Sequence, residues 1–367
     1  MKIPFFNYPS LFNQRKKEYL EVITDVLDRG AFIMQKDLIE FEERLSTLLG
    51  VTHAIGMADG TMSLIIALRA SGVGDDDEVI LPSHTFAASA AAIVHVGAKP
   101  ILVDCGKDHL IDPESIEKVI TSKTKAIMPV QLNGRTAAMD SMLRIANSNN
   151  LLIIEDSCQA LGSKYNNQFA GTFGVAGTFS FFPAKTLGCF GDGGAIVTNS
   201  QEIAEKVRLL RDHGRDDADG KVKSFGYNSR LDNVHAAVLN LKLDYYTEDI
   251  NRRRTIAKIY DEMLNNLDSL DLPPGPYSNE KNYDIYQNYE IEANDRDGLQ
   301  KFLDSKGIGT IRQWGGYALH QFEDLNLKLD EPNYTDEMTK RFLLLPMHPL
   351  LTDDEVKYIC DQIIKFY

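Results

Sequence analysis

Lys185 is the residue whose surroundings most clearly indicate chemistry. It follows a short apolar segment, Thr178 to Phe182, that is typical of a buried strand, and a proline and several glycines surround it. Burial in such a turn lowers the pKa of a lysine amine and frees its lone pair to form a Schiff base with an aldehyde. A lone lysine in a loop is more often a solvated surface residue. The upstream segment from Leu151 to Gly162, which carries Asp156 and Gln159, is what favours the chemical interpretation.

Pyridoxal 5′-phosphate (PLP) is an aldehyde cofactor whose ring and amine requirements match these residues. Lys185 offers the amine. Asp156, at the end of a predicted strand, would keep the pyridine nitrogen protonated through a charge-assisted bond worth about 1.5–3 kcal/mol. Capping the next helix is an equally common role for such an aspartate. Gln159, three residues further on, would donate to the ring hydroxyl oxygen.

The phosphate and the apolar face of such a ring also have candidates. Asp59-Gly60-Thr61 precedes a helical run, and the free backbone N–H groups of a helix start bind phosphate. Glycine permits close approach there, although many loops carry this short motif. Ser180 could add a hydroxyl. Phe86, just after another predicted strand, would stack on the ring, although a phenylalanine in that position more often belongs to the core.

Apolar runs alternate with helical patterns between residues 50 and 200. We expect strands at His53–Met57, Glu78–Leu81, Pro100–Val103, Lys125–Met128, Leu151–Ile154, Thr178–Phe182 and Ala195–Thr198. We expect helices at Thr61–Ala70, Ala87–Val96, Pro113–Ile120 and Ala137–Asn147. The alternation predicts an α/β fold with parallel strands joined by crossover helices. Ligands bind outside the carboxyl ends of such strands, so Asp156 and Lys185 should meet at one edge.

The C-terminal part has a different pattern. Residues 230–268 predict one or two helices, and the Arg252–Arg254 run is expected on a solvated face. Beyond Pro276 a strand is expected over Tyr283–Ile291, and a capping box, Thr352 with Glu355, predicts a terminal helix. We therefore expect a large PLP-binding domain over residues 1–245, with an N-terminal helical segment at about residues 10–30, and a smaller α/β domain over residues 246–367.

Composition excludes several classes of protein. The formal charge is −14, from 39 basic and 53 acidic residues, which argues against a nucleic-acid partner. The four cysteines are widely separated, so neither a metal site nor a disulfide framework is indicated. The N-terminus lacks the apolar core of a signal peptide, and the longest apolar stretch is too short to span a bilayer. We expect a cytoplasmic protein without a membrane partner.

Five segments together resemble the DegT/DnrJ/StrS family of PLP-dependent nucleotide-sugar aminotransferases. They are Ile154-Glu-Asp-Ser-Cys-Gln-Ala, Phe179-Ser-Phe-Phe-Pro-Ala-Lys-Thr-Leu-Gly188, Gly191-Asp-Gly-Gly-Ala195, Gly226-Tyr-Asn-Ser-Arg-Leu-Asp232 and Leu345-Pro-Met-His-Pro349. The resemblance covers nearly the whole chain. It implies the fold-type I architecture of aspartate aminotransferase, in which helices flank a mostly parallel central sheet.

The resemblance also implies a role for each residue. Lys185 would be the lysine that forms the Schiff base, Asp156 the partner of the pyridine nitrogen, and Gln159 a neighbour of the ring oxygen. Gly60, Thr61 and Ser180 would hold the phosphate, and Phe86 would lie against the ring. Asn228 would reach the cofactor of a second subunit, which implies a homodimer with shared active sites. Arg230 is implied near the sugar nucleotide.

The implied reaction moves an amino group from L-glutamate to a keto-sugar linked to a nucleoside diphosphate. Pro-x-Lys-x-Leu-Gly and Gly-Asp-Gly-Gly resemble members that aminate C3 of the sugar. Members that act at C4, such as perosamine-type enzymes, more often carry a glutamate where this chain has Asp192. The product would be an amino sugar for a surface glycan such as the O-antigen of lipopolysaccharide.

The chain departs from the family between Arg312 and His320, in a loop expected to face the sugar. Many members have a His-Tyr pair there, and this chain reads Gln313-Trp-Gly-Gly-Tyr317. Gln313, Trp314 and His320 are therefore substrate candidates, and Trp314 would either stack on the substrate or fill the domain interface. His320 and His348 are each more typical of structural residues.

Three alternatives have different sequence requirements. A sugar 3-dehydratase on a similar scaffold carries histidine in place of the lysine, so Lys185 argues against it. A non-catalytic PLP-binding regulator would need a partner-binding element such as a basic helix, and none is visible. A Rossmann dinucleotide site needs Gly-x-Gly-x-x-Gly after a first strand, an order that the glycines of residues 188–194 lack.

Overall fold

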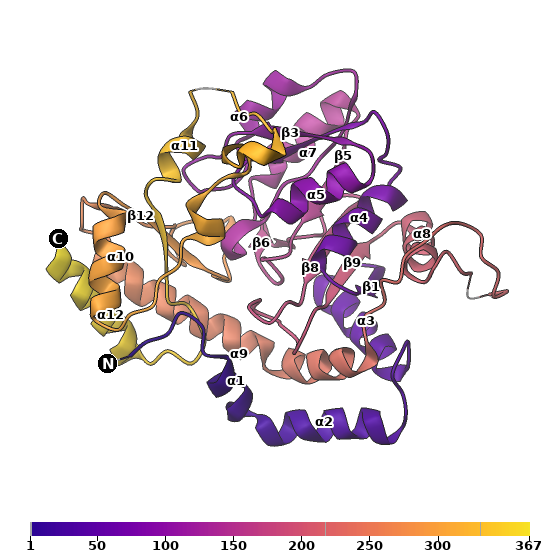
Figure 1. The fold of residues 1–367 in the computed structure, drawn as a ribbon, viewed down its shortest axis with the longest axis horizontal. Coiled ribbons are helices and arrows are strands. Elements are labelled where there is room, and N and C mark those ends of the chain that lie inside the picture. The colour runs from indigo at the N-terminus through magenta and orange to yellow at the C-terminus, as the bar shows by residue number, and fades with distance from the viewer. Residues whose placement is uncertain (1, 217, 331) are drawn as a thin grey trace.

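A seven-stranded sheet organises the N-terminal part of the described chain (Figure 1). The computed structural model describes residues 2–216, 218–330 and 332–367. The sheet strands are β1 (His53–Met57), β2 (Glu78–Pro82), β3 (Lys99–Val103), β4 (Thr124–Ile127), β5 (Leu152–Asp156), β8 (Ala176–Ser180) and β9 (Gly194–Thr198). Their order is β1-β9-β8-β5-β4-β2-β3. The predicted α/β fold with a mostly parallel sheet is confirmed.

β9 is the exception to the parallel arrangement that the sequence predicts. It pairs antiparallel with both β1 and β8, whereas β8, β5, β4, β2 and β3 pair parallel. The physical reason is the connection: residues 181–193 form a loop instead of a crossover helix, so the chain turns straight back beside β8. That loop carries Lys185.

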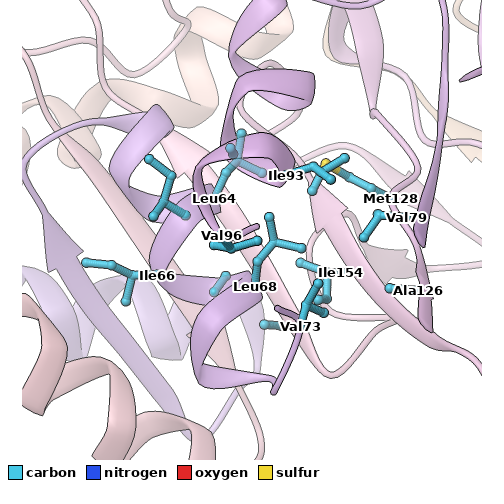
Figure 2. Packing of buried hydrophobic residues seen from close by; sticks show 14 of the residues in the cluster. Leu64, Ile66, Leu68, Val73, Val79, Ile93, Val96, Ala126, Met128 and Ile154 are labelled. Carbon is cyan, nitrogen blue, oxygen red and sulfur yellow. The ribbon is translucent and has the colours of Figure 1, made fainter. Parts of the chain in front are cut away.

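Helices cover both faces of the sheet, because its strands are apolar on both sides. One face packs on α4 (Gly60–Ala70), α5 (Ala87–His95) and α8 (Gln201–Arg211), and Figure 2 shows part of this core. Within β2, Val79 and Leu81 face this core while Ile80 faces the opposite one, as strand geometry requires. The opposite face packs on α3 (Lys36–Leu49), α7 (Met139–Asn149) and α9 (Asn233–Leu264).

A separate core lies in the C-terminal part. Apart from Ile3, its buried residues run from Ile256 to Ile363. It is built from the antiparallel sheet β10 (Leu270–Asp271), β12 (Tyr289–Ala293) and β13 (Phe342–Leu345), with α10 (Arg296–Ser305), α12 (Asp353–Phe366) and the end of α9. We call this part the small lobe and the rest the large lobe. The expected boundary at residue 245 falls inside α9, which runs unbroken through both lobes (Figure 1).

Shorter elements complete the described chain. They are α1 (Tyr8–Gln14), α2 (Lys16–Asp28), α6 (Pro113–Ile116), α11 (Tyr334–Met338), β6 (Lys164–Tyr165), β7 (Gln168–Phe169) and β11 (Asn282–Tyr283), with 3₁₀ turns at Glu117–Val119, Leu132–Gly134, Gln313–Gly316, Leu319–Gln321 and Glu323–Leu325. Among the described residues, none of the helices combines the length and the apolar composition that a membrane span requires.

Two expectations for the C-terminal part need correction, and one is confirmed. Arg253 and Arg254 are buried, not solvated, because they donate to backbone carbonyl groups, such as those of Met347 and Asp284, that would otherwise lack partners. The strand expected over residues 283–291 is divided into β11 and β12. The Thr352 capping box starts α12 as predicted, since Thr352 and Glu355 exchange hydrogen bonds.

Candidate active site

A cavity of about 760 Å³ lies where the carboxyl ends of the parallel strands meet residues of the small lobe. The structure brings a set of the predicted cofactor residues to its wall: Gly60, Thr61, Phe86, Asp156, Gln159, Ser180 and Lys185. Of the predicted substrate residues, Gln313 and Trp314 also line it. Side chains from segments more than a hundred residues apart therefore share one site.

Lys185 lies in the loop between β8 and β9. Gln287, which precedes β12 of the small lobe, contacts the backbone of this loop immediately before and immediately after Lys185. Gln287 Nε2 donates to Ala184 O at 2.8 Å, and Gln287 Oε1 accepts from Thr186 N at 2.7 Å. Burial lowers the pKa of Lys185, and its neighbours Cys158 and Asp156 oppose that shift. The amine is thus closer to its neutral, nucleophilic form than that of an ordinary lysine.

Asp156 ends β5 and receives two hydrogen bonds at its carboxylate. Ser89 Oγ donates to Oδ2 at 2.7 Å, and the Cys158 N–H donates to Oδ1 at 3.2 Å. The sequence reasoning missed Ser89. The signal was available, since Ser89 is the one polar residue in the alanine-rich start of α5 (residues 87–92).

The start of α4 supplies the predicted anion site. The side chain of Asp59 caps it by accepting from Met62 N, and Ser63 N bonds to Asp59 O. The backbone N–H groups of Gly60 and Thr61 are therefore the ones left for a ligand. A Cβ at Gly60 would lie 2.9 Å from Ser180 Cβ and 3.0 Å from Cys158 Sγ. Glycine is thus required for the helix start to approach the end of β8.

Two aromatic residues cover the cavity on the side of the small lobe. Phe86 is 55% exposed, so it belongs to the cavity wall and not to the core. Its ring centroid lies 6.3 Å from that of Trp314. Trp314 adopts φ 49°, and Gly315 and Gly316 follow with φ of 77° and 93°. This left-handed turn, which glycine favours, sets Trp314 beside Phe86.

Four residues considered in the sequence analysis lie outside the cavity wall. Asn228 is exposed on the surface of this chain, and Arg230 pairs with Asp212 at 2.7 Å. His320 lies between Ser83 Oγ, at 2.6 Å, and Asp336 Oδ1, at 2.8 Å. His348 is buried, and burial together with the charge of Arg253 lowers its pKa to about 4.

The residues around the cavity fit PLP. A lysine amine of lowered pKa, an oriented carboxylate, a helix start with a glycine that a Cβ would obstruct, and an exposed aromatic face line the same space. These are the groups that an aldehyde, a pyridine nitrogen, a phosphate and an aromatic ring require.

Comparison with known proteins agrees with this fit. The model of the DegT/DnrJ/EryC1/StrS aminotransferase family matches residues 13–364. The pleiotropic regulatory protein of Geobacillus stearothermophilus is 37% identical over 100% of this chain and 99% of its own length. The UDP-2-acetamido-2-deoxy-3-oxo-D-glucuronate aminotransferase of Pseudomonas aeruginosa is 35% identical over 92% of this chain and 93% of its own. The crystal structure of NtdA from Bacillus subtilis with the bound cofactor PMP has a TM-score of 0.90 and 30% identity, covering 100% of this chain and 85% of that one.

Proposed function

Because the chain belongs to the DegT/DnrJ/EryC1/StrS aminotransferase family, we propose that it moves an amino group from L-glutamate to C3 of a keto-sugar linked to a nucleoside diphosphate. The enzyme is a PLP-dependent nucleotide-sugar aminotransferase, and the donor and the position on the sugar are our proposals. The observation that best supports PLP-dependent amino transfer is the meeting of the Lys185 amine and the Asp156 carboxylate in one cavity.

Each part of the cavity has a task in holding PLP. Lys185 would bind it through Nζ, and Asp156 would hold the protonated ring nitrogen while Ser89 fixes the carboxylate. Gly60, Thr61 and Ser180 would bind the phosphate, Gln159 would donate to the ring oxygen, and Phe86 would cover one face. When bound, PLP supplies a ring that withdraws electrons from the carbon that gains or loses a proton.

Lys185 would also move the proton in each half-reaction. Burial lowers its pKa and so favours the neutral amine, whose Nζ can accept a proton and return it to another atom, as a general base and then a general acid. Phe86 and Trp314 shield that side of the cavity with apolar surface, which limits the access of water to the reacting atoms.

C3 is supported by the sequence and by the relative from P. aeruginosa, whose name is that of a 3-oxo-sugar aminotransferase. Asp192, which stands where C4 enzymes more often carry glutamate, lines the cavity. The alternative is amination at C4, as in perosamine-type enzymes. In either case the product would serve a surface glycan.

The first test is to add L-glutamate to the purified, PLP-loaded protein and record its absorbance. We expect the visible band of the lysine-bound cofactor to be replaced by that of the aminated cofactor. Dilution into dTDP-, UDP- and GDP-linked 3- and 4-ketosugars should then restore the band with 3-ketosugars. An unchanged spectrum with glutamate would favour a regulatory role, and recovery with 4-ketosugars alone would refute C3.

Substitution of Lys185 checks that this chemistry depends on the amine. Lys185→Ala and Lys185→Arg should both lose turnover by at least about 10³-fold, because arginine keeps the charge but not the nucleophile. Both proteins should also lack the visible band. Normal turnover in either variant would contradict the assignment of Lys185.

We propose in addition a homodimer whose subunits share active sites through Asn228. Asn228 is exposed and outside the cavity of its own chain, as such a role requires. Lys185→Ala and Asn228→Ala subunits, each weakened alone, should together form hybrids with one intact site. Coexpression with different affinity tags should recover up to half of the wild-type rate. Hybrids no more active than the Asn228→Ala protein would argue against shared sites.

A further inference from the structure

A buried charge cluster joins the two lobes behind the cavity wall. The large lobe contributes His84 and His109, and β12 of the small lobe contributes Glu290 and Glu292. His109 Nδ1 lies 2.7 Å from Glu290 Oε1, and His109 Nε2 lies 3.0 Å from Glu292 Oε1. His84 Nε2 approaches Glu290 Oε1 at 3.2 Å. All four side chains are buried.

The cluster holds Glu290 in its ionised form. Burial alone would raise the pKa of Glu290, but the charge of His84 and the hydrogen bond from His109 lower it below its ordinary range. Burial alone would lower the pKa of His109, and its two glutamate partners raise it to about 9. An ionised carboxylate accepts hydrogen bonds and cannot donate them.

This acceptor fixes the direction of two side-chain amides. Asn133 Nδ2 donates to Glu290 Oε1 at 3.0 Å, and Gln313 Nε2 donates to Glu290 Oε2 at 2.9 Å. The carbonyl oxygen of Asn133 is thereby turned the other way, and it accepts from Gln313 Nε2 at 2.7 Å. Both N–H groups of Gln313 are therefore used, one on each acceptor.

Gln313 is left with its carbonyl oxygen as the polar atom free for a ligand. Among the residues that the structure describes, Gln313 Oε1 has no hydrogen-bond partner, and Gln313 lines the cavity. Hydrogen-bond chemistry fixes the orientation of both amides. Because the ionised Glu290 carboxylate can only accept, the atoms of Asn133 and Gln313 that contact it must be the nitrogens.

We propose that Glu290 is a positioning residue, which orients Gln313 so that its carbonyl oxygen accepts a hydrogen bond from a hydroxyl or amide N–H group of the sugar. This inference rests on the proposed function, since it concerns the substrate of the same site. It assigns Gln313 to the sugar half-reaction and gives Glu290, which does not line the cavity, a role in specificity.

The same cluster has the spacing of a metal site, and its contacts argue against that use. Ligand atoms of His84, His109 and Glu290 lie within 4.8 Å of one another. Both nitrogens of His109 are already engaged by carboxylates, and both oxygens of Glu290 already accept from amides.

The test compares two isosteric substitutions, Glu290→Gln and Glu292→Gln. Both residues contact His109, but only Glu290 contacts Asn133 and Gln313. A glutamine at 290 can donate as well as accept, so the two amides can turn over. We expect KM for the nucleotide sugar to rise about fivefold to tenfold in Glu290→Gln, the range of one lost hydrogen bond. The half-reaction with glutamate should change less than twofold, and Glu292→Gln should keep KM within twofold.

The single variant Gln313→Met keeps the proposal testable if Glu290→Gln folds poorly. Gln313→Met removes the acceptor while keeping the length of the side chain, and should raise KM to the same extent. If Glu290 acts through Gln313, the double variant Glu290→Gln/Gln313→Met should have the same KM for the nucleotide sugar as Gln313→Met alone. The proposal would be overturned if the effects of the two substitutions on KM multiplied in the double variant. It would also be overturned if KM rose as much in Glu292→Gln as in Glu290→Gln.

Two further outcomes separate this inference from others. A wild-type protein that aminates no nucleotide keto-sugar would refute the proposed function, whereas an active wild type whose Glu290→Gln variant keeps its KM refutes the inference alone. Loss of activity on dialysis against EDTA, with recovery on adding Zn²⁺, would also overturn it, because Glu290 would then be a metal ligand.

Discussion

Ser89 fixes the direction of the Asp156 carboxylate, which we propose to hold the cofactor ring. Its hydroxyl bonds Asp156 Oδ2 at 2.7 Å and also lies 2.8 Å from Thr85 Oγ1. All three side chains are buried. A side chain that loses its partner through substitution therefore cannot replace that hydrogen bond with one to water. Ser89 should therefore affect, through Asp156, how tightly the ring is held.

Replacing Ser89 with alanine should weaken PLP binding about 10- to 100-fold. A hydrogen bond to a charged group contributes about 1.5–3 kcal/mol, and its loss leaves Asp156 poorly oriented. Trp314, the single tryptophan, lines the cavity, so quenching of its fluorescence can measure the affinity. Thr85→Val is the control, since it keeps the bond between Ser89 and Asp156 and should cost less than threefold. Equal affinities in the two variants would contradict this role of Ser89.

At the scale of elements, the site depends on how closely the start of α4 approaches the end of β8. Gly60 sets the closest distance that the helix and the strand can reach, because a side chain at this position would meet Ser180 and Cys158. On the proposed assignment, this contact between helix and strand would let the free N–H groups and the Ser180 hydroxyl face the same anion.

Gly60→Ala should push the start of α4 away from β8 and weaken PLP binding at least tenfold. Overpacking of this kind costs about 1–3 kcal/mol, so the Tm of the protein should fall as well. Gly74→Ala is the matched control, because the nearest atom to its Cβ would be Val96 O at 3.9 Å. PLP titration and calorimetry on both variants would decide. If Gly60→Ala behaves like Gly74→Ala, the close approach is not needed.

The sequence predicted elements better than it predicted contacts between them. β1 has the predicted bounds, and β2, β3, β4, β5 and β9 were placed to within two residues, because buried strands form apolar runs between turns. Lys185 and Asp156 could be placed at one edge from the same pattern. The direction of β9 was missed, since a strand has the same local pattern whichever way it runs.

The network around Gln313 and the burial of Arg253 could not have been predicted from local pattern. Asn133, Glu290 and Gln313 are separated by up to 180 residues, and their contacts exist only once the small lobe packs on the large one. Likewise, an arginine run is normally solvated. Burial of Arg253 follows from the carbonyl groups that it meets in the folded chain.

At the scale of the whole molecule, we expect the charge cluster to make the contact between lobes dependent on pH. His109 faces His84, Glu290 and Glu292, while Tyr334 and Arg341 contact Glu292 from its other side. The pKa of His109 is raised to about 9, so its contribution to stability is complete below the unfolded pKa of about 6.5 and is lost as pH rises through about 9. The lowered pKa of Glu290 makes its contribution complete above about pH 4.5 and lost in more acidic solution.

We therefore expect His109→Asn to lower the Tm most between about pH 4.5 and 6.5. The difference from wild type should shrink as pH rises from 6.5 to above 9, because the wild-type imidazolium is then deprotonated. Asparagine suits the position, since His109 has φ 63° and asparagine tolerates this left-handed conformation. Calorimetry across this pH range provides the measurement. A difference that stays constant from pH 5 to 10 would show that the charge of His109 does not matter.

Gln287 has a consequence for attempts to re-engineer specificity. Its side-chain amide forms hydrogen bonds with the backbone on either side of Lys185, although Gln287 belongs to the segment leading into β12. A chimera that grafts the C-terminal portion of another homologue onto this scaffold would replace Gln287, which holds the loop of Lys185, together with Gln313 and Trp314, the proposed substrate residues of the cavity. Such transplants should retain turnover when the donor sequence carries a glutamine at this point, and lose it otherwise, however well the grafted surface suits its new sugar.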